Sequence, residues 1–152
     1  MTYEELVDIF KDAVTAYTGD LAFHYDKVWY NNGAPSNKYP SMLFECSPDF
    51  ELVGQQSNNR TGQQTFTGKL FFYDKFWQSE RSAKDTYVKQ SELNELALQI
   101  IGHINGQTQT IPTQQIAWGK GFFGLDVHNP ELVQVYVPFV ATIKSECTPL
   151  AI

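Results

Sequence analysis

Arginine is the scarcest charged residue in this sequence, which contains only Arg60 and Arg81. Seventeen acidic residues outnumber eleven basic ones, and residues 1–50 hold eight of the acids against three bases. Tight binding to duplex DNA or to an anionic membrane needs clustered Lys and Arg side chains. We therefore expect neither a membrane partner nor specific binding of nucleic acid.

Cysteines and long apolar runs are also scarce. Cys46 and Cys147 stand far apart without metal-ligand spacing, so we interpret them as free thiols of a reducing cytosol. No apolar run approaches the roughly 18 residues of a membrane-spanning helix. The start at Met1 is acidic, unlike a signal peptide. With 152 residues, of which 42% are hydrophobic, the chain can bury the core of one domain without a metal or a disulfide.

Apolar residues at three- and four-residue spacing predict two helices. The first covers residues 4–17, opens on Thr2 and Glu5 at capping-box spacing, and ends at residues 18–20. Its stripe is Leu6, Ile9, Phe10, Ala13, Val14 and Tyr17. The second covers residues 85–105 and ends at Asn105-Gly106. Its stripe is Val88, Leu93, Leu96, Ala97, Ile100, Ile101 and Ile104.

Runs of alternating or aromatic residues predict strands over residues 21–30, 41–46, 50–53, 65–74, 111–118 and 132–144. Pro138, in the middle of the last run, indicates a bulge or an edge position. Strands grouped between two helices are typical of an α+β fold. We predict one α+β domain over residues 1–152, with a mainly antiparallel sheet covered by two helices.

Residues 54–64 contain no apolar side chain, so they cannot join a core and are predicted to form a long exposed hairpin loop. Such a loop is either a mobile hairpin tip or an element that docks to a partner. The candidate partner-binding side chains are Gln55, Gln56, Asn58, Asn59, Arg60, Gln63 and Gln64.

Motifs for catalysis and cofactor binding are weak. Residues 119–124 match the GxGxxG pattern, but no helix follows that could hold a pyrophosphate, so we interpret them as a loop between strands. Asp126 and His128 could orient each other, yet no nucleophile stands nearby in the sequence. His24 and His103 share no metal-ligand spacing with His128. We predict no enzyme, no cofactor and no metal.

Taken in order, these elements resemble the tail-terminator, or tail-completion, proteins of tailed bacteriophages. The matching pieces are the helix at residues 4–17, strands 21–30 and 38–44, the polar loop, strand 68–74, helix 85–105 and strand 133–143. The resemblance covers nearly the whole chain as a pattern of elements and includes no short diagnostic motif.

This resemblance implies a structural function. Family members form rings, commonly hexamers, that cap the tail tube and join it to the head connector while DNA passes through the lumen. It also implies a place in the virion after assembly in the host cytoplasm, and partners that are further copies of the chain, the tail tube and the connector. The loop at residues 54–64 is then the candidate docking element, and the acidic charge would repel DNA phosphates from the lumen.

Two alternatives remain open at this point. One is a ligand-binding or catalytic α+β domain with an aromatic pocket between sheet and helix, which these residues could line: Tyr25, Trp29, Phe44, Phe66, Phe72 and Trp77. The other is an adaptor whose exposed sheet edge pairs with a strand of a partner.

Overall fold

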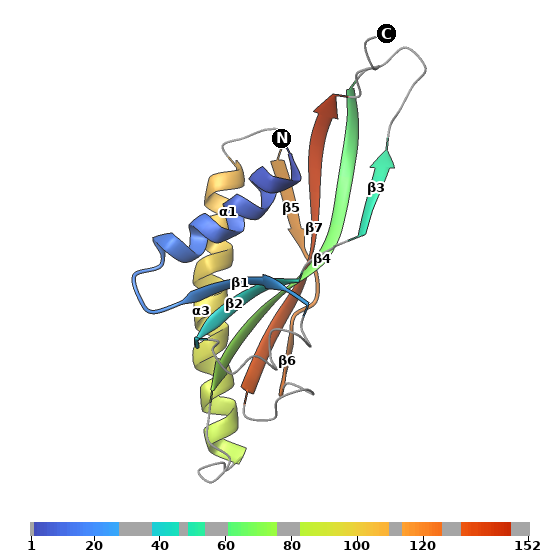
Figure 1. Cartoon of the computed structure of the whole chain (residues 1–152). Coiled ribbons are helices and arrows are strands. Elements are labelled where there is room, and N and C mark those ends of the chain that lie inside the picture. The colour runs from blue at the N-terminus through green and yellow to red at the C-terminus, as the bar shows by residue number, and fades with distance from the viewer. Residues whose placement is uncertain are drawn as a thin grey trace.

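Two strands of fifteen residues each, β4 (Thr61–Lys75) and β7 (Leu132–Glu146), pair antiparallel over their whole length (Figure 1). This pair is the spine of the sheet in the computed structural model, which describes residues 2–27, 38–45, 49–53, 61–75, 83–109, 114–125 and 132–146. The other elements are α1 (Tyr3–Ala16), β1 (Ala22–Asp26), β2 (Ser41–Glu45), β3 (Asp49–Val53), α3 (Ala83–Gln109), β5 (Gln114–Trp118) and β6 (Phe122–Leu125). The predicted α+β class is confirmed.

Four short strands flank the spine in pairs. β2 and β3 both pair with β4, one near each end, and β5 and β6 both pair with β7. β1 lies outside β2 and is parallel to it, whereas every other pairing is antiparallel. The predicted mainly antiparallel sheet is therefore confirmed. β3 and β6 lie on opposite edges of the spine.

Both helices cover the same face of the sheet (Figure 1). α1 begins at the predicted capping box, in which the Glu5 amide donates to Thr2 Oγ1 at 3.2 Å and the Thr2 amide donates to Glu5 Oε2 at 2.6 Å. These bonds satisfy amides that a helix start leaves without partners. Four residues of the predicted stripe are buried: Leu6, Phe10, Ala13 and Val14.

The second helix, α3, is longer than predicted, and the stop predicted at Asn105-Gly106 is wrong. Ile104 and Thr108 are both buried, and the Thr108 hydroxyl donates to the Ile104 carbonyl at 3.0 Å. Packing of this last turn against the sheet outweighs the cost of about 1 kcal/mol for an internal glycine. In the part of the chain that the structure describes, no helix is long and apolar enough to cross a membrane.

The core lies between the helices and the sheet. Phe66, Leu70 and Phe72 of β4 point into it, and so do Val133, Val135, Phe139, Ala141 and Ile143 of β7. At its centre, the Phe10 ring lies 5.0 Å from Phe44 and 5.1 Å from Phe139, centroid to centroid. The opposite face carries a smaller buried cluster of Leu43, Phe71, Tyr73 and Leu132. β2 is therefore buried on both faces, with Met42 and Phe44 in the main core and Leu43 in the smaller cluster.

Pro138 is accommodated without a bulge in the ladder between β4 and β7. β5 ends opposite Phe139 and β6 begins opposite Tyr136, so the second edge of β7 is interrupted at this residue. The Pro138 carbonyl accepts a bond from the Gly119 amide at 2.8 Å, on the side of β5 and β6. In an antiparallel sheet the backbone nitrogen and carbonyl of one residue face the same neighbouring strand. The Pro138 nitrogen therefore faces the gap between β5 and β6, where its missing N–H removes no hydrogen bond of the sheet.

We predict that Gly119→Ala destabilises the fold. A Cβ at this position would stand 2.9 Å from Cγ of the Pro138 ring, which cannot move aside freely. Overpacking of this kind typically costs about 1–3 kcal/mol. Urea unfolding of the variant should show that loss in the free energy of unfolding.

The matched control is Gly102→Ala, where an added Cβ on α3 meets nothing within 4 Å. In a helix interior this change should stabilise by roughly 0.5–1 kcal/mol. Equal unfolding midpoints for the two variants would contradict the close approach at Gly119.

Candidate functional site

The predicted docking loop is shorter than expected. Gln63 and Gln64 belong to β4 and pair with both β3 and β7, so their assignment to a loop is wrong. Strand pairing satisfies the backbone N–H and C=O groups of a residue regardless of its side chain. A run of polar residues can therefore extend β4 where β3 and β7 lie on either side of it. The other candidates, Gln55, Gln56, Asn58, Asn59 and Arg60, lie outside the described residues.

The β3 edge carries exposed apolar side chains. Phe50 is 61% exposed and Leu52 is 55% exposed, and both lie on the helix-bearing face of the sheet. The Phe50 ring lies 6.0 Å from that of Phe66, which in turn lies 5.2 Å from Tyr3 at the start of α1. One side of the Phe50 ring therefore contacts Phe66, which packs in the core. Asp49 and Glu51 alternate with these residues and are exposed on the opposite face.

The β6 edge is the second exposed apolar surface. Phe123 is 61% exposed on the helix-bearing face, with Leu125 beside it, and Phe122 is 41% exposed on the opposite face. The Phe122 ring stacks on Tyr136 at 4.8 Å, and the Lys120 ammonium lies 5.6 Å from the Phe122 centroid. Gln90 Nε2 of α3 donates to the Gly124 carbonyl at 3.2 Å.

Sequence reasoning missed β6, because the three glycines of residues 119–124 were interpreted as a loop. Only Gly119, Lys120 and Gly121 connect β5 to β6. The signal that could have found the strand is the apolar pair Phe122-Phe123 at the end of the glycine run.

Two of the usual protections against pairing with another chain are present in the described residues, since both strands are short and β3 carries the charged Asp49 and Glu51. Soluble proteins also commonly place Lys or Pro on edge strands, or cover the edge with a helix or loop. The sequences of β3 and β6 contain neither residue. Within the described ranges, β3 pairs only with β4, and β6 pairs only with β7. Both strands therefore present an unpaired backbone edge beside exposed apolar side chains.

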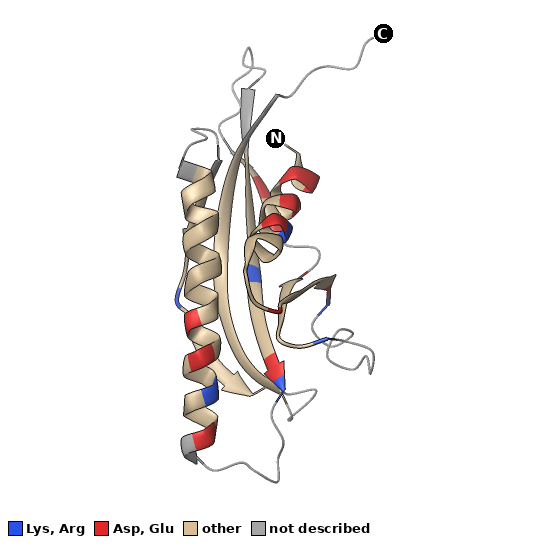
Figure 2. Cartoon of the chain, turned by 90° about the vertical axis from the view of Figure 1, so that its left-hand side faces the viewer, with Lys and Arg blue, Asp and Glu red and all other residues tan. Residues whose placement is uncertain are grey.

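The acidic charge is concentrated on the helical layer (Figure 2). Glu4, Glu5, Asp8 and Asp12 of α1 are all exposed, with Lys11 among them. α3 adds Glu92 and Glu95, which line a polar groove of about 260 Å³ between this helix, the end of β4 and the residues that follow α1.

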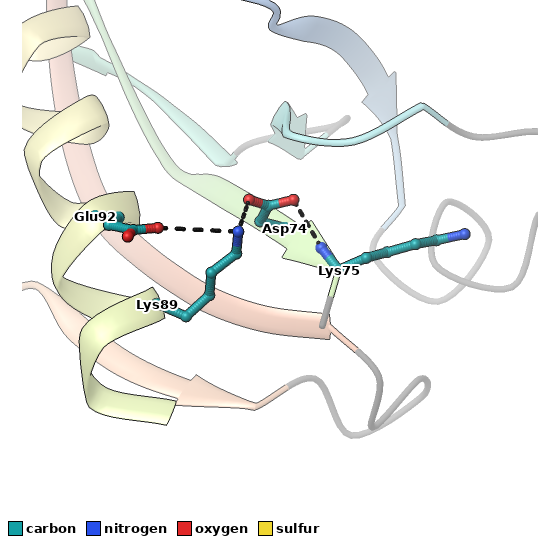
Figure 3. Close-up of polar contacts among 4 residues, drawn as sticks. All are labelled: Asp74, Lys75, Lys89 and Glu92. Carbon is teal, nitrogen blue, oxygen red and sulfur yellow. Dashed lines mark hydrogen bonds and ion pairs between the residues drawn. The ribbon is translucent and has the colours of Figure 1, made fainter. Parts of the chain in front are cut away.

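Two carboxylates of this groove, Asp74 and Glu92, contact Lys89 of α3 (Figure 3). Lys89 Nζ lies 2.9 Å from Asp74 Oδ2 and 3.9 Å from Glu92 Oε2. Asp74 also accepts a bond from the Lys75 amide at 2.8 Å. Both carboxylate oxygens of Asp74 are engaged, so the group ties α3 to the end of β4 rather than offering a free acid or base.

The residues proposed to line an aromatic pocket lie elsewhere. Phe44, Phe66 and Phe72 are buried in the core, and Tyr25 stacks on Phe44 at the surface. Trp29 and Trp77 lie outside the described residues. The three phenylalanines thus serve packing, and none of them faces the polar groove.

The titratable candidates do not converge either. His24 lies on β1, and His103 is exposed on α3, which continues to Gln109. Asp126 and His128 fall outside the described residues. Among the residues that are described, no three His, Cys, Asp or Glu side chains are arranged to hold a metal ion.

Comparison of the chain with protein-family models and with curated proteins found no match in either case. The candidate site therefore rests on this chain's own geometry. Its distinguishing feature, among the described residues, is a pair of different edge strands with exposed apolar side chains on opposite sides of one sheet.

We predict that Asp74 and Lys89 contribute a small coupling to stability. Both side chains are less than one third exposed, so a double-mutant cycle with Asp74→Asn and Lys89→Met should give about 0.5–1 kcal/mol. Thermal or urea unfolding of the two single variants and the double variant measures it.

The control is Glu92→Gln, because Glu92 is 64% exposed and lies farther from Lys89. Its coupling to Lys89 should be near zero. If Glu92 coupled to Lys89 as strongly as Asp74 does, both carboxylates together, and not Asp74 alone, would hold Lys89 in place.

Proposed function

We propose that this chain is a structural protein of a phage tail or neck, which assembles into a ring, caps the tail tube and joins it to the head connector. The observation that carries the proposal is the pair of exposed apolar edges, β3 on one side of the spine and β6 on the other. The resemblance in the order of elements supplies the tail assignment.

Two unlike edges favour a ring over a simple dimer. A twofold dimer uses the same surface on both partners, whereas contact between two different surfaces repeats from copy to copy and closes when the rotation permits. A chain that exposes β3 on one side of the sheet and β6 on the other is suited to this head-to-tail arrangement. Six copies is the number that the resemblance implies.

The charge distribution agrees with passage of DNA through such a ring. An acidic helix such as α1 repels phosphates, so DNA crosses the lumen without specific binding. In this proposal the protein works by assembly, without a cofactor and without catalysis. Its place is the virion, after assembly in the host cytoplasm.

The solution mass tests the ring. Light scattering over a concentration series should show a species of several copies, with six expected, and negative-stain images should show closed rings. A monomer at every concentration, or a dimer that never grows, would contradict the proposal.

The loop substitution tests docking separately from ring formation. One variant carries Ser at five positions together: Gln55, Gln56, Asn58, Asn59 and Arg60. We expect its ring mass and unfolding midpoint to be unchanged, because these positions follow the last residue of β3 and precede the first residue of β4. Co-sedimentation with assembled tubes of the tail-tube protein from the same genome should be lost. Undiminished co-sedimentation would remove the docking role from residues 54–60.

A further inference from the structure

We propose that β3 of one copy pairs with β6 of the next copy, so that the sheet continues from subunit to subunit. The inference rests on the proposed ring and names the contact that builds it. The β3 edge of each copy is then covered by the β6 edge of one neighbouring copy, and its β6 edge by the β3 edge of another.

The direction of the two strands permits this pairing. β3 is antiparallel to β4, β4 to β7, and β7 to β6. β3 and β6 therefore run in opposite senses within one chain. Copies arranged in the same sense would bring them together as an antiparallel ladder, the more stable kind of strand pair.

Side-chain alternation restricts the register. Phe50 and Leu52 lie on the helix-bearing face, as do Phe123 and Leu125, so the two apolar sets must lie on the same side of a continuous sheet. Placing Phe50 opposite Phe123 satisfies this condition and joins the two most exposed aromatic side chains of the two edges. Aromatic cross-strand pairs stabilise a sheet more than an alanine pair does.

Charge selects the same register. With Phe50 opposite Phe123, Glu51 lies opposite Phe122 on the other face of the sheet. The ammonium of Lys120 stands over the Phe122 ring, so the Glu51 carboxylate would meet a cation. The β3 edge is acidic through Asp49 and Glu51, and the β6 edge is preceded by a lysine, which makes the two edges complementary.

The other described edge strands are less suited. The apolar residues of β5, Ile116 and Trp118, pack against the core, and Trp118 Nε1 donates to Asn105 of α3 at 2.8 Å. On β1, Phe23 packs against the core, and the Tyr25 hydroxyl lies 3.0 Å from that of Tyr3. The large side chains of β5 and β1 therefore already make contacts within their own chain.

Cysteine cross-linking tests the contact. In full-length chains with Cys46→Ser and Cys147→Ser, one preparation carries Phe50→Cys and another carries Phe123→Cys. Because directly opposed residues of two paired strands have Cα atoms within the distance that a disulfide spans, oxidation of the mixture should give a dimer with one chain of each kind. Each preparation alone should stay free of disulfide dimers, and a chain with both cysteines should give a ladder of multimers.

The control chain carries Leu98→Cys, which is 59% exposed on α3 and belongs to neither edge. It should not cross-link to Phe50→Cys. Disulfide dimers from Phe50→Cys alone would overturn the proposal in favour of an edge that pairs with itself. Cross-linking of Leu52→Cys, but not Phe50→Cys, to Phe123→Cys would overturn the register.

Charge exchange gives a readout that does not depend on cysteine chemistry. Glu51→Lys and Lys120→Glu should each raise the concentration at which copies associate by several-fold, and the two changes in one chain should restore the original value. Rings of wild-type mass that give no cross-link and no charge effect would overturn the edge pairing and leave the ring. A wild-type monomer would overturn both.

Discussion

The antiparallel ladder between β4 and β7 is the constraint on which the rest of the structure depends. It offers two edges and two faces, and every other described strand and helix occupies one of these, except β1, which pairs with β2. Because its fifteen residue pairs extend beyond each short flanking strand, each edge of the ladder accommodates two strands in succession. The division of each edge between an inner-packed strand and an exposed one follows from that length.

The helical layer accounts for which strands are exposed. α1 and α3 cover one face, and Phe10, Phe44 and Phe139 fill its centre. Side chains of β1 and β5 pack against this core, whereas Phe50 and Leu52 of β3 and Phe123 of β6 remain exposed at the edges of the sheet. Their apolar side chains face the helix-bearing side without being covered. The exposed apolar edges are therefore the parts of the helix-bearing face that the two helices leave uncovered.

Much of the fold follows from sequence periodicity. The stripe of α1, its capping box and the alternation in β4 and β7 each depend on contacts close in sequence or on burial of one face, which a single sequence records well. The failures share a different cause. The extension of α3 past Asn105-Gly106, the pairing of Gln63 and Gln64, and β6 after Gly121 all depend on a neighbouring element that overrides the local signal. The candidate edges could not be predicted for the same reason, since exposure of Phe50 and Phe123 depends on which parts of the sheet the helices cover.

Pairing within the spine also joins parts of the chain that are distant in sequence. More than fifty residues, including all of α3, separate Lys75 from its partner Leu132. Closing such a loop costs entropy before the ladder repays it, so folds dominated by contacts of this range form slowly. While β7 is being synthesised and docked, β4 stands as a long open edge. Another chain in the same state could fill that edge with its own β7, and the yield of correctly folded subunits would then fall as the concentration of newly made chains rises.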